Sequence, residues 1–392
     1  MGVRGWLARR AVRATRVLVV EGGNAFERRV AVERAVHGRG WRLAESPASA
    51  DALVVVGDLG PELRDVVERL WDAMPGPRAR AEAPVVDAEG ALDDVAAALL
   101  DPARQSEDAS TRAPEPDLAR DHGDMDHEGM DHGDMDHEGM DHGDMDHGDM
   151  DHGDMDHGGM DMAPGGIPLA GGSDEDRDGL EMDELPLRLG PVLPGWPAGL
   201  VIDVALHGDL VVKASARVLG SVAAGGDPES ATPTVRAARH CDEAATVLDL
   251  CGWAEGAGLA RSARDALLDR AGDDGRGALI DLRHRVEHSR LLRWSLREVG
   301  VVTEQHAADL DLPEAVVGDC RDRLLRLVDR AIAVAPTFPG VQAPPPAAEA
   351  ESPVVPLHDW GRLIEGRDLV EARLVIATLG APVAADTVVT GG

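Results

Sequence analysis

Short apolar runs alternate with amphipathic segments over the first hundred residues. Residues 17–20 and 52–56 are uninterrupted apolar stretches, which is typical of strands that are buried on both faces of a parallel sheet. Pro61 opens a segment with apolar side chains at helical spacing. Because strands and helices alternate, we expect a right-handed parallel α/β domain over residues 17–100. Its expected elements are strands at 17–20, 52–56 and 83–86 and helices at 25–36, 61–71 and 91–100.

The pattern changes after residue 180. Apolar runs at 200–206 and 210–212 flank His207-Gly208-Asp209, which predicts a hairpin with a Gly-Asp turn. Helical periods follow and predict a mainly helical α+β domain over residues 181–335. Residues 336–392 are expected to be a Pro-rich linker and a tail, in which the apolar run 369–379 fits either a strand or a short helix. The expected helical faces are Ala244, Val247, Leu248 and Cys251; Leu279, Leu282 and Val286; and Cys320, Leu324, Leu327, Val328 and Ala331.

Residues 101–180 connect the two expected domains. They are rich in Asp, Pro, Gly and Ser and have too little apolar content to bury a core, which predicts a disordered linker. Residues 121–161 contain 16 Asp or Glu and no Lys or Arg, within a chain of formal net charge −33. Binding to nucleic acid requires a positive surface that releases counterions, so this charge argues against nucleic acid as a partner. Cations and basic protein surfaces are the expected partners.

The linker contains the repeat Asp-His-x-x-Met with a period of five at 121–162, which holds eight of the 15 His and nine of the 12 Met. This period matches neither a helix nor a strand, so the segment is expected to act as a flexible multidentate ligand. Imidazole and thioether groups favour copper or nickel ions over calcium or magnesium. Such repeats can also persist as inert spacers, and the sequence leaves both interpretations open. The candidate ligands are His122, His127, His132, His137, His142, His147, His152, His157, Met125, Met130, Met135, Met140, Met145, Met150, Met155 and Met160.

Other candidate ligands are weaker. Cys241, Cys251 and Cys320 match no CxxC spacing, so they are expected to be buried small hydrophobes in a reducing compartment. His284 and His288 lie one helical turn apart, as paired metal ligands often do. Their arginine neighbours favour a solvated charged face instead.

Three motifs mark the N-terminal domain. Ser-Pro-Ala-Ser-Ala-Asp at 46–51 precedes the apolar run, Leu-Trp-Asp-Ala-Met-Pro-Gly-Pro-Arg occupies 70–78, and Gly-Gly-Asn-Ala-Phe-Glu occupies 22–27. They resemble motifs of the small-subunit family shared by nickel-iron hydrogenases and complex I (NADH-quinone oxidoreductase): Ser-Pro-x-x-Ala-Asp, Tyr-Asp-x-Met-Pro-x-Pro-Lys and the loop Gly-x-Cys-Asn-Gly-Cys-Glu. The resemblance implies a flavodoxin-like parallel sheet.

In that family the loop supplies two thiolates to a four-iron cluster. Here Gly23 and Phe26 stand at the aligned positions, and no cysteine precedes Cys241. The resemblance therefore implies a degenerate loop and no cofactor in the folded domains. The loop residues are Gly22, Gly23, Asn24, Phe26 and Glu27.

The second domain opens with Gly-Pro-Val-Leu-Pro-Gly-Trp-Pro-Ala-Gly-Leu at 190–200, ahead of the expected hairpin. This frame resembles the Gly-Pro-x-His-Pro-x-x-His-Gly opening of the hydrogenase-large-subunit family in complex I. Leu193 stands where the first family histidine would be, and no histidine occupies the second position. The chain has no tyrosine, so the quinone-site tyrosine of that family is absent too.

These resemblances imply a fused, non-catalytic subunit or assembly factor of a complex-I-like or hydrogenase-like redox complex, with other subunits of that membrane-associated complex as partners. One alternative is a copper or nickel storage or delivery protein that acts through the repeat. Another is an active NADH-quinone oxidoreductase subunit with a divergent site. Because no run of about 18 apolar residues occurs, a cytoplasmic location is expected. The basic segment 1–16 could then dock on an acidic partner or on the inner face of the membrane.

Overall fold

A computed structural model describes residues 9–83, 87–112, 184–219, 231–269, 272–335 and 355–380, together with the short paired strands β5 (Asp174–Glu175) and β6 (Glu181–Met182). All sixteen candidate ligands of the His/Met repeat lie outside these residues. Among the described helices, none combines the length and the apolar content needed to cross a membrane.

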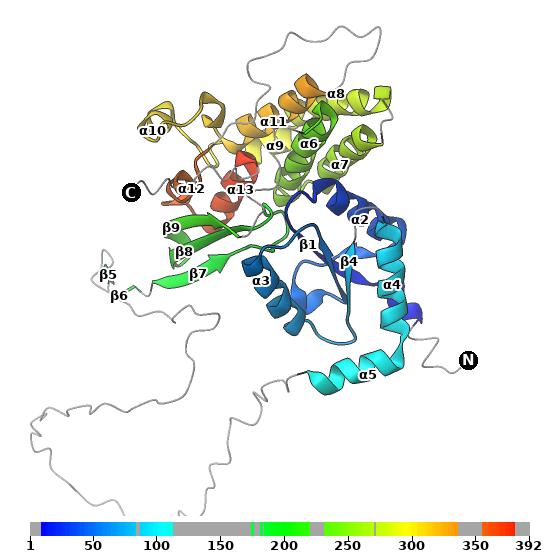
Figure 1. Cartoon of the computed structure of the whole chain (residues 1–392). Helices are drawn as coiled ribbons and strands as arrows, with labels where there is room; N and C mark the ends of the chain where they lie inside the picture. The colour runs from blue at the N-terminus through cyan, green and yellow to red at the C-terminus, as the bar shows by residue number, and fades with distance from the viewer. Residues whose placement is uncertain are drawn as a thin grey trace, which may run out of the picture.

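The N-terminal domain is a parallel α/β fold, as its hydrophobic pattern predicts. Four parallel strands stand in the order β2-β1-β3-β4. Helices α2 and α4 cover one face of this sheet, and α3 covers the other (Figure 1). The elements are β1 (Arg16–Glu21), α2 (Phe26–Gly38), β2 (Arg42–Leu43), β3 (Ala52–Val56), α3 (Pro61–Asp72), β4 (Ala79–Ala83) and α4 (Ala88–Leu100).

The third strand was expected at 83–86, and in the structure the third long strand is β4, which starts four residues earlier. β4 begins at Ala79, which pairs with Ala52, and it alternates small and charged residues as an edge strand does. The two valines that suggested a later strand, Val85 and Val86, lie outside the described residues. The expected helix at 91–100 starts three residues earlier, because the Asp87 carboxylate caps it by accepting a hydrogen bond from the Gly90 amide.

A further helix extends the N-terminal domain into the expected linker. Helix α5 (Pro102–Thr111) follows Asp101, whose side chain caps it. Its Gln105 side chain donates hydrogen bonds to the carbonyls of Arg78 and Ala98, at 3.0 and 2.9 Å. Arg78 in turn forms an ion pair with Asp108 at 3.0 Å. Polar contacts rather than an apolar stripe hold α5, so the hydrophobic pattern did not indicate it.

The C-terminal domain combines a three-stranded antiparallel sheet, in the order β7-β8-β9, with a helical bundle. The expected hairpin is confirmed, with Gly208 and Asp209 forming the turn between paired His207 and Leu210. The three predicted helical faces are buried apart from half-buried Cys251. The elements are β7 (Leu185–Leu189), β8 (Leu200–His207), β9 (Leu210–Val218), α6 (Pro233–Leu250), α7 (Ala254–Leu268), α8 (Gly272–His288), α9 (Arg290–Ser295), α10 (Glu304–Asp309) and α11 (Cys320–Val334).

Two helices occupy the region that we expected to be a tail. They are α12 (Leu357–Ile364) and α13 (Leu369–Leu379), so the apolar run whose period was ambiguous is a helix. Trp360, Ile364 and Val375 are buried in the same core as β8 and α11. The C-terminal domain therefore extends well beyond residue 335.

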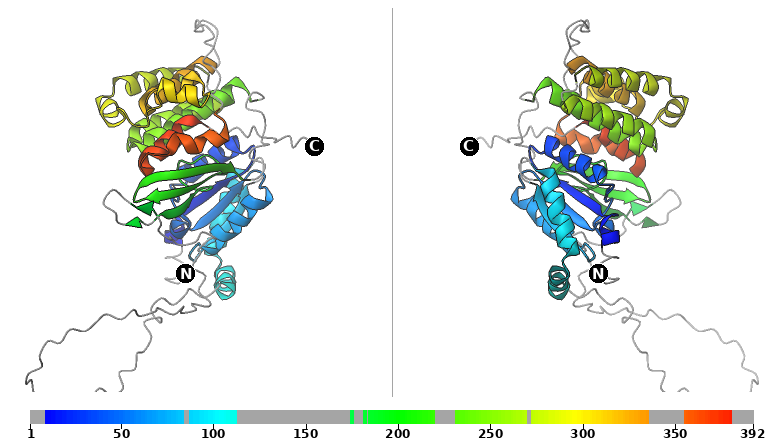
Figure 2. Two further views of the ribbon diagram at one scale, coloured as in Figure 1. Left: turned by 90° about the vertical axis from the view of Figure 1, so that its left-hand side faces the viewer. Right: turned by 90° about the vertical axis from the view of Figure 1, so that its right-hand side faces the viewer.

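The two domains pack directly against each other. Phe26 and Val30 of α2 share a buried cluster with Cys241 of α6 and Leu279 of α8. On the other sheet face, Val201 of β8 joins the cluster formed by β1, β3 and α3. Figure 2 shows the helices of the C-terminal domain at one end of the molecule and the parallel sheet at the other.

Candidate functional site

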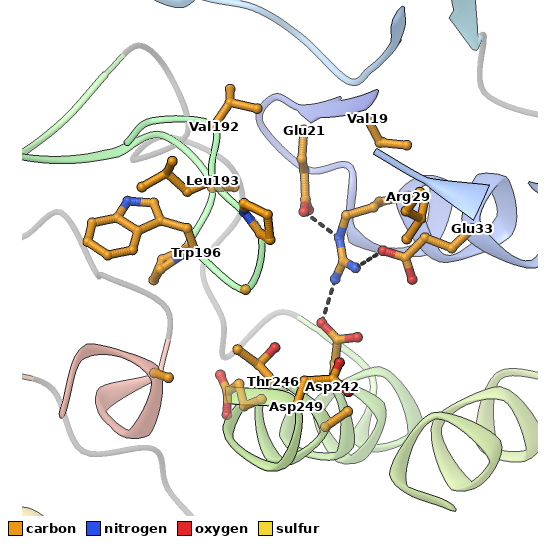
Figure 3. Close-up of a pocket in the computed structure, with 18 of the residues that line it drawn as sticks. Val19, Glu21, Arg29, Glu33, Val192, Leu193, Trp196, Asp242, Thr246 and Asp249 are labelled. Carbon is orange, nitrogen blue, oxygen red and sulfur yellow. Dashed lines mark hydrogen bonds and ion pairs between the residues drawn. The ribbon is translucent and has the colours of Figure 1, made fainter. Parts of the chain in front are cut away.

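A cavity of about 710 Å³ lies at the junction of the two domains. The N-terminal domain contributes β1 and α2 to its wall, and the C-terminal domain contributes the segment 191–198 and helices α6, α7 and α13. Figure 3 shows the segment of Val192, Leu193 and Trp196 on one side and the charged groups of α2 and α6 on the other.

The loop of Gly22, Gly23, Asn24, Phe26 and Glu27 follows β1 beside this cavity. Gly22 packs so closely on the next strand's loop that a Cβ atom there would lie 2.6 Å from the carbonyl oxygen of Asp58. Asn24 has a left-handed backbone with φ of 52°, and Glu27 points to solvent. Phe26 is buried and lines the cavity at the first position of α2. Phe26 thus lines the cavity, whereas Gly23 does not.

The opening segment of the C-terminal domain supplies the apolar side of the cavity. The indole Nε1 of Trp196 donates a hydrogen bond to the Leu200 carbonyl at 2.8 Å, which fixes the ring. Leu193, at the position of the family histidine, lines the cavity and keeps 37 % of its surface exposed. Leu193 and Phe26 therefore border the same space, although they come from different domains.

A network of charged side chains lines the opposite wall. Arg29 of α2 donates to Glu21 of β1 at 2.6 Å and to Asp242 of α6 at 2.6 Å, and it also pairs with Glu33 one turn along its own helix (Figure 3). Arg29 thereby joins both domains through one guanidinium group.

A second guanidinium completes the network. Arg264 of α7 pairs with Asp242 at 2.6 Å, with Glu33 at 2.9 Å and with Asp265 at 2.9 Å, and its side chain is only 3 % exposed. Three carboxylates, of Glu21, Glu33 and Asp242, thus surround two arginines. Buried charges persist in proteins only when they are paired in this way.

The carboxylates of the network differ in acidity. Burial raises the pKa of Glu21 above its ordinary value, and the neighbouring charge of Asp242 adds to the rise, although Arg29 opposes it. Burial also opposes ionisation of Asp242, but Arg29 and Arg264 outweigh it and lower the pKa of Asp242. Glu21 is therefore the more readily protonated of the two groups.

The cysteines and paired histidines lie outside this network. Burial raises the pKa of the Cys241 and Cys320 thiols and raises the pKa of Cys251 to about 12, so all three are protonated at neutral pH. The rings of His284 and His288 stack at 4.2 Å on an exposed face. In the part of the chain that the structure describes, no three His, Cys, Asp or Glu residues form a group that could hold a metal ion.

The sequence motifs drew attention to two apolar residues of the cavity, Phe26 and Leu193, but gave no indication of the ionic network. Glu33 could have indicated a buried ion pair, because it falls among the buried positions Val30, Val32 and Val36 of α2. Asp242, directly after Cys241 on α6, could have done so too. Neither position indicates its partner in the other domain, which is Arg264 for Glu33 and Arg29 for Asp242.

No protein-family model matches this chain, and no curated protein matches it either.

Proposed function

We propose that this chain is a non-catalytic, cluster-less subunit or assembly factor of a membrane-associated redox complex related to complex I or to nickel-iron hydrogenases. The observation that carries the proposal is that Phe26 and Leu193 line one interdomain cavity. In the families that the sequence resembles, the aligned positions hold a cluster cysteine and a histidine. Phe26 and Leu193 belong to two separate motifs, and both border the same cavity. This supports a common origin of the two domains with a small subunit and a large subunit that bind each other.

The arrangement of the N-terminal strands adds support. The order β2-β1-β3-β4 is the start of the flavodoxin-like order, which would fit a small-subunit relative. In such a fold a ligand binds where the strands end and the order reverses. Here that position, between β1 and β3, is filled by the close approach of Gly22 to Asp58.

Residues at the cavity favour a binding role over catalysis. A phenyl ring and an isobutyl group cannot ligate iron or transfer protons, unlike the thiolate and imidazole that they replace. The Phe26 ring instead lies beneath the guanidinium groups of Arg239 and Arg29, at 4.6 and 5.4 Å. Ion pairs and shared apolar clusters hold the domains together, so the chain can present both to a partner as one unit.

A partner-binding surface is available on α9. Trp294 is 79 % exposed and Leu291 63 % exposed, one helical turn apart. Arg290 and Arg293 flank them, and among the described residues neither has a carboxylate partner. Exposed tryptophan and arginine are typical of protein interfaces. We assign this surface to an acidic face of another subunit of the complex, at the cytoplasmic side of the membrane.

Affinity purification of the full chain from its source cells tests this function. Subunits of a quinone reductase or hydrogenase should co-purify. Iron and acid-labile sulfide analysis separates this function from that of an active oxidoreductase subunit with a divergent site, because only the latter requires a cluster.

A second candidate function is storage or delivery of copper or nickel through the repeat at 121–162. The specific observation is the concentration of eight His and nine Met in that segment. Soft thioether and imidazole ligands together suit these metals. In this case the folded domains would serve to dock the repeat near a recipient protein.

A further inference from the structure

Five arginines line the interdomain cavity, and they fall into two groups. Arg29 and Arg264 belong to the ionic network, and Arg261 pairs with Asp249. Arg239 and Arg373 have no carboxylate partner among the described residues. The cavity therefore contains two guanidinium groups whose charge is not balanced by an ion pair.

Arg239 projects from α6 beside the degenerate loop. Its guanidinium lies 4.6 Å from the centroid of the Phe26 ring, and its charge acts on Glu21 without forming an ion pair with it. A cation over an aromatic ring is only partly compensated, because the ring carries no net charge. Its donors remain available to a ligand in the cavity.

Arg373 of α13 stands beside the apolar segment of the cavity. One of its terminal nitrogens donates to the Pro194 carbonyl at 2.9 Å, which fixes the side chain. Its Nε atom is buried, and no described residue offers that atom an acceptor. A buried donor without a partner is unfavourable, so protein groups do not fully satisfy this guanidinium.

The cavity wall also includes apolar groups. Val192, Leu193 and Trp196 come from the opening segment, and Leu250 from the end of α6. Because Leu193 remains 37 % exposed, this wall is accessible rather than closed by packing. An apolar wall with a few convergent polar groups is the usual composition of a small-molecule site.

The acidic residues of the wall do not cancel this arrangement. The Oε2 atom of Glu243 lies 3.0 Å from Nδ1 of buried His240 on the same helix, so this carboxylate is engaged by α6 itself rather than by Arg239 or Arg373. Glu45 is exposed, so water and salt screen its charge. Glu21, Glu33 and Asp242 are held by Arg29 and Arg264, and burial favours the neutral form of Glu21, which reduces the excess of three carboxylates over two arginines.

We propose that the cavity binds an amphipathic anion, with a carboxylate or phosphate head held by Arg239 or Arg373 and an apolar body against Leu193 and Trp196. Charge-assisted bonds from a guanidinium group to either head are short and bidentate. The site is independent of the proposed redox function, since binding is measured on the isolated chain without any partner subunit.

Calorimetric titration of the full chain with four ten-carbon amphiphiles, each below its micelle concentration, tests the proposal. The amphiphiles are decanoate, decyl phosphate, decanol and decylammonium. At least one of the two anions should bind ten-fold or more tightly than both decanol and decylammonium. The preferred anion identifies the head as carboxylate or phosphate. Equal binding of all four, or no binding of either anion, would overturn the proposal.

Substitutions of residues that line the cavity test whether the anion binds there. Arg373→Gln and Arg239→Gln should together weaken binding of the preferred anion at least ten-fold, whereas exposed Arg104→Gln on α5 should not change it. Leu193→Asp should also weaken it, whereas Leu187→Asp, at a position of similar exposure on β7, should not. Unchanged binding in the double arginine variant would show that the anion binds elsewhere and would reject the site.

Discussion

Arg29 and Asp242 form a 2.6 Å ion pair that joins the two domains across 213 positions of sequence. The same carboxylate group of Asp242 also accepts from Arg264, at 2.6 Å. One carboxylate on α6 therefore balances an arginine from each domain, and the pair becomes the centre of the buried network. Replacing Asp242 should therefore cost more folding stability than replacing a carboxylate of an exposed ion pair.

Asp242→Asn should destabilise the protein by about 3 kcal/mol at neutral pH, because two partly buried guanidinium groups lose a shared countercharge. Urea unfolding followed by linear extrapolation measures the change in the free energy of unfolding. Asp249→Asn is the matched control on the same helix, since its pair with Arg261 is about 40 % exposed on both sides and contributes at most about 1 kcal/mol. Equal losses for the two variants would contradict the role of the network.

Glu21→Gln should increase the free energy of unfolding at pH 8, whereas Asp242→Asn should decrease it. The raised pKa of Glu21 means that the ionised group is less favourable in the folded protein than in the unfolded chain. The stabilising contribution of Glu21 is present below the unfolded value of about 4.3 and is lost as pH rises through the folded value. Glu21→Gln should therefore be more stable than the wild type at pH 8, and the gain should shrink as pH falls toward 4.5. A variant that is less stable at every pH would show that the bond to Arg29 dominates instead.

The Asp242 contribution follows the reverse pH dependence. The pKa of Asp242 is lower in the folded protein than in the unfolded chain, where it is about 3.9. Asp242 therefore stabilises the folded protein above pH 3.9, and this stabilisation is lost as the pH falls through its pKa in the folded protein. The stability difference between the wild type and Asp242→Asn should accordingly stay constant from pH 8 to pH 5.

Purified protein should show no iron-sulfur absorbance and no quinone reductase activity, because Gly23 and Phe26 stand where the small-subunit family that the sequence resembles has cluster cysteines, and Leu193 where the large-subunit family has a histidine. Iron and acid-labile sulfide should be far below one atom per chain after aerobic and anaerobic purification alike. Stoichiometric iron with a cluster spectrum would contradict the assignment and support an active subunit instead.

The repeat should bind copper or nickel through several weak to moderate sites. Because each site needs neutral imidazole, affinity should fall as pH drops through about 6.5. Titration of each metal into the full chain and into a chain lacking residues 121–162 measures this, with magnesium as the control metal. If the deletion leaves the stoichiometry and the pH dependence unchanged, the repeat is a spacer.

Much of the fold could be predicted from hydrophobic pattern alone. The strand at 52–56 and the helix after Pro61 were found with nearly correct bounds, because one is a continuous apolar run and the other has a clear apolar face. β4 was misplaced because an edge strand needs few apolar residues. α5 was missed because Gln105 and Asp108 hold it through polar contacts with Arg78.

The candidate site was predictable only in part. The motif resemblance singled out Phe26 and Leu193, but nothing in the sequence placed them in one cavity. The ionic network, and the lack of a carboxylate partner for Arg239 and Arg373 among the described residues, depend on how segments far apart in the chain come together. Such pairings follow from how the domains pack, which local pattern does not encode.

The central claim, that the chain is a docked subunit without redox chemistry, is tested most directly by quantitative affinity purification of the tagged full chain from membranes of its source. Subunits of one quinone reductase or hydrogenase complex should be enriched with the wild type. The double variant Leu291→Ser and Trp294→Ser should lose at least about ten-fold of that enrichment, because interface truncations of anchor side chains cost about 2 kcal/mol or more each. The exposed variant Val370→Ser should retain the enrichment. Enrichment of no redox subunit with the wild type would contradict the account.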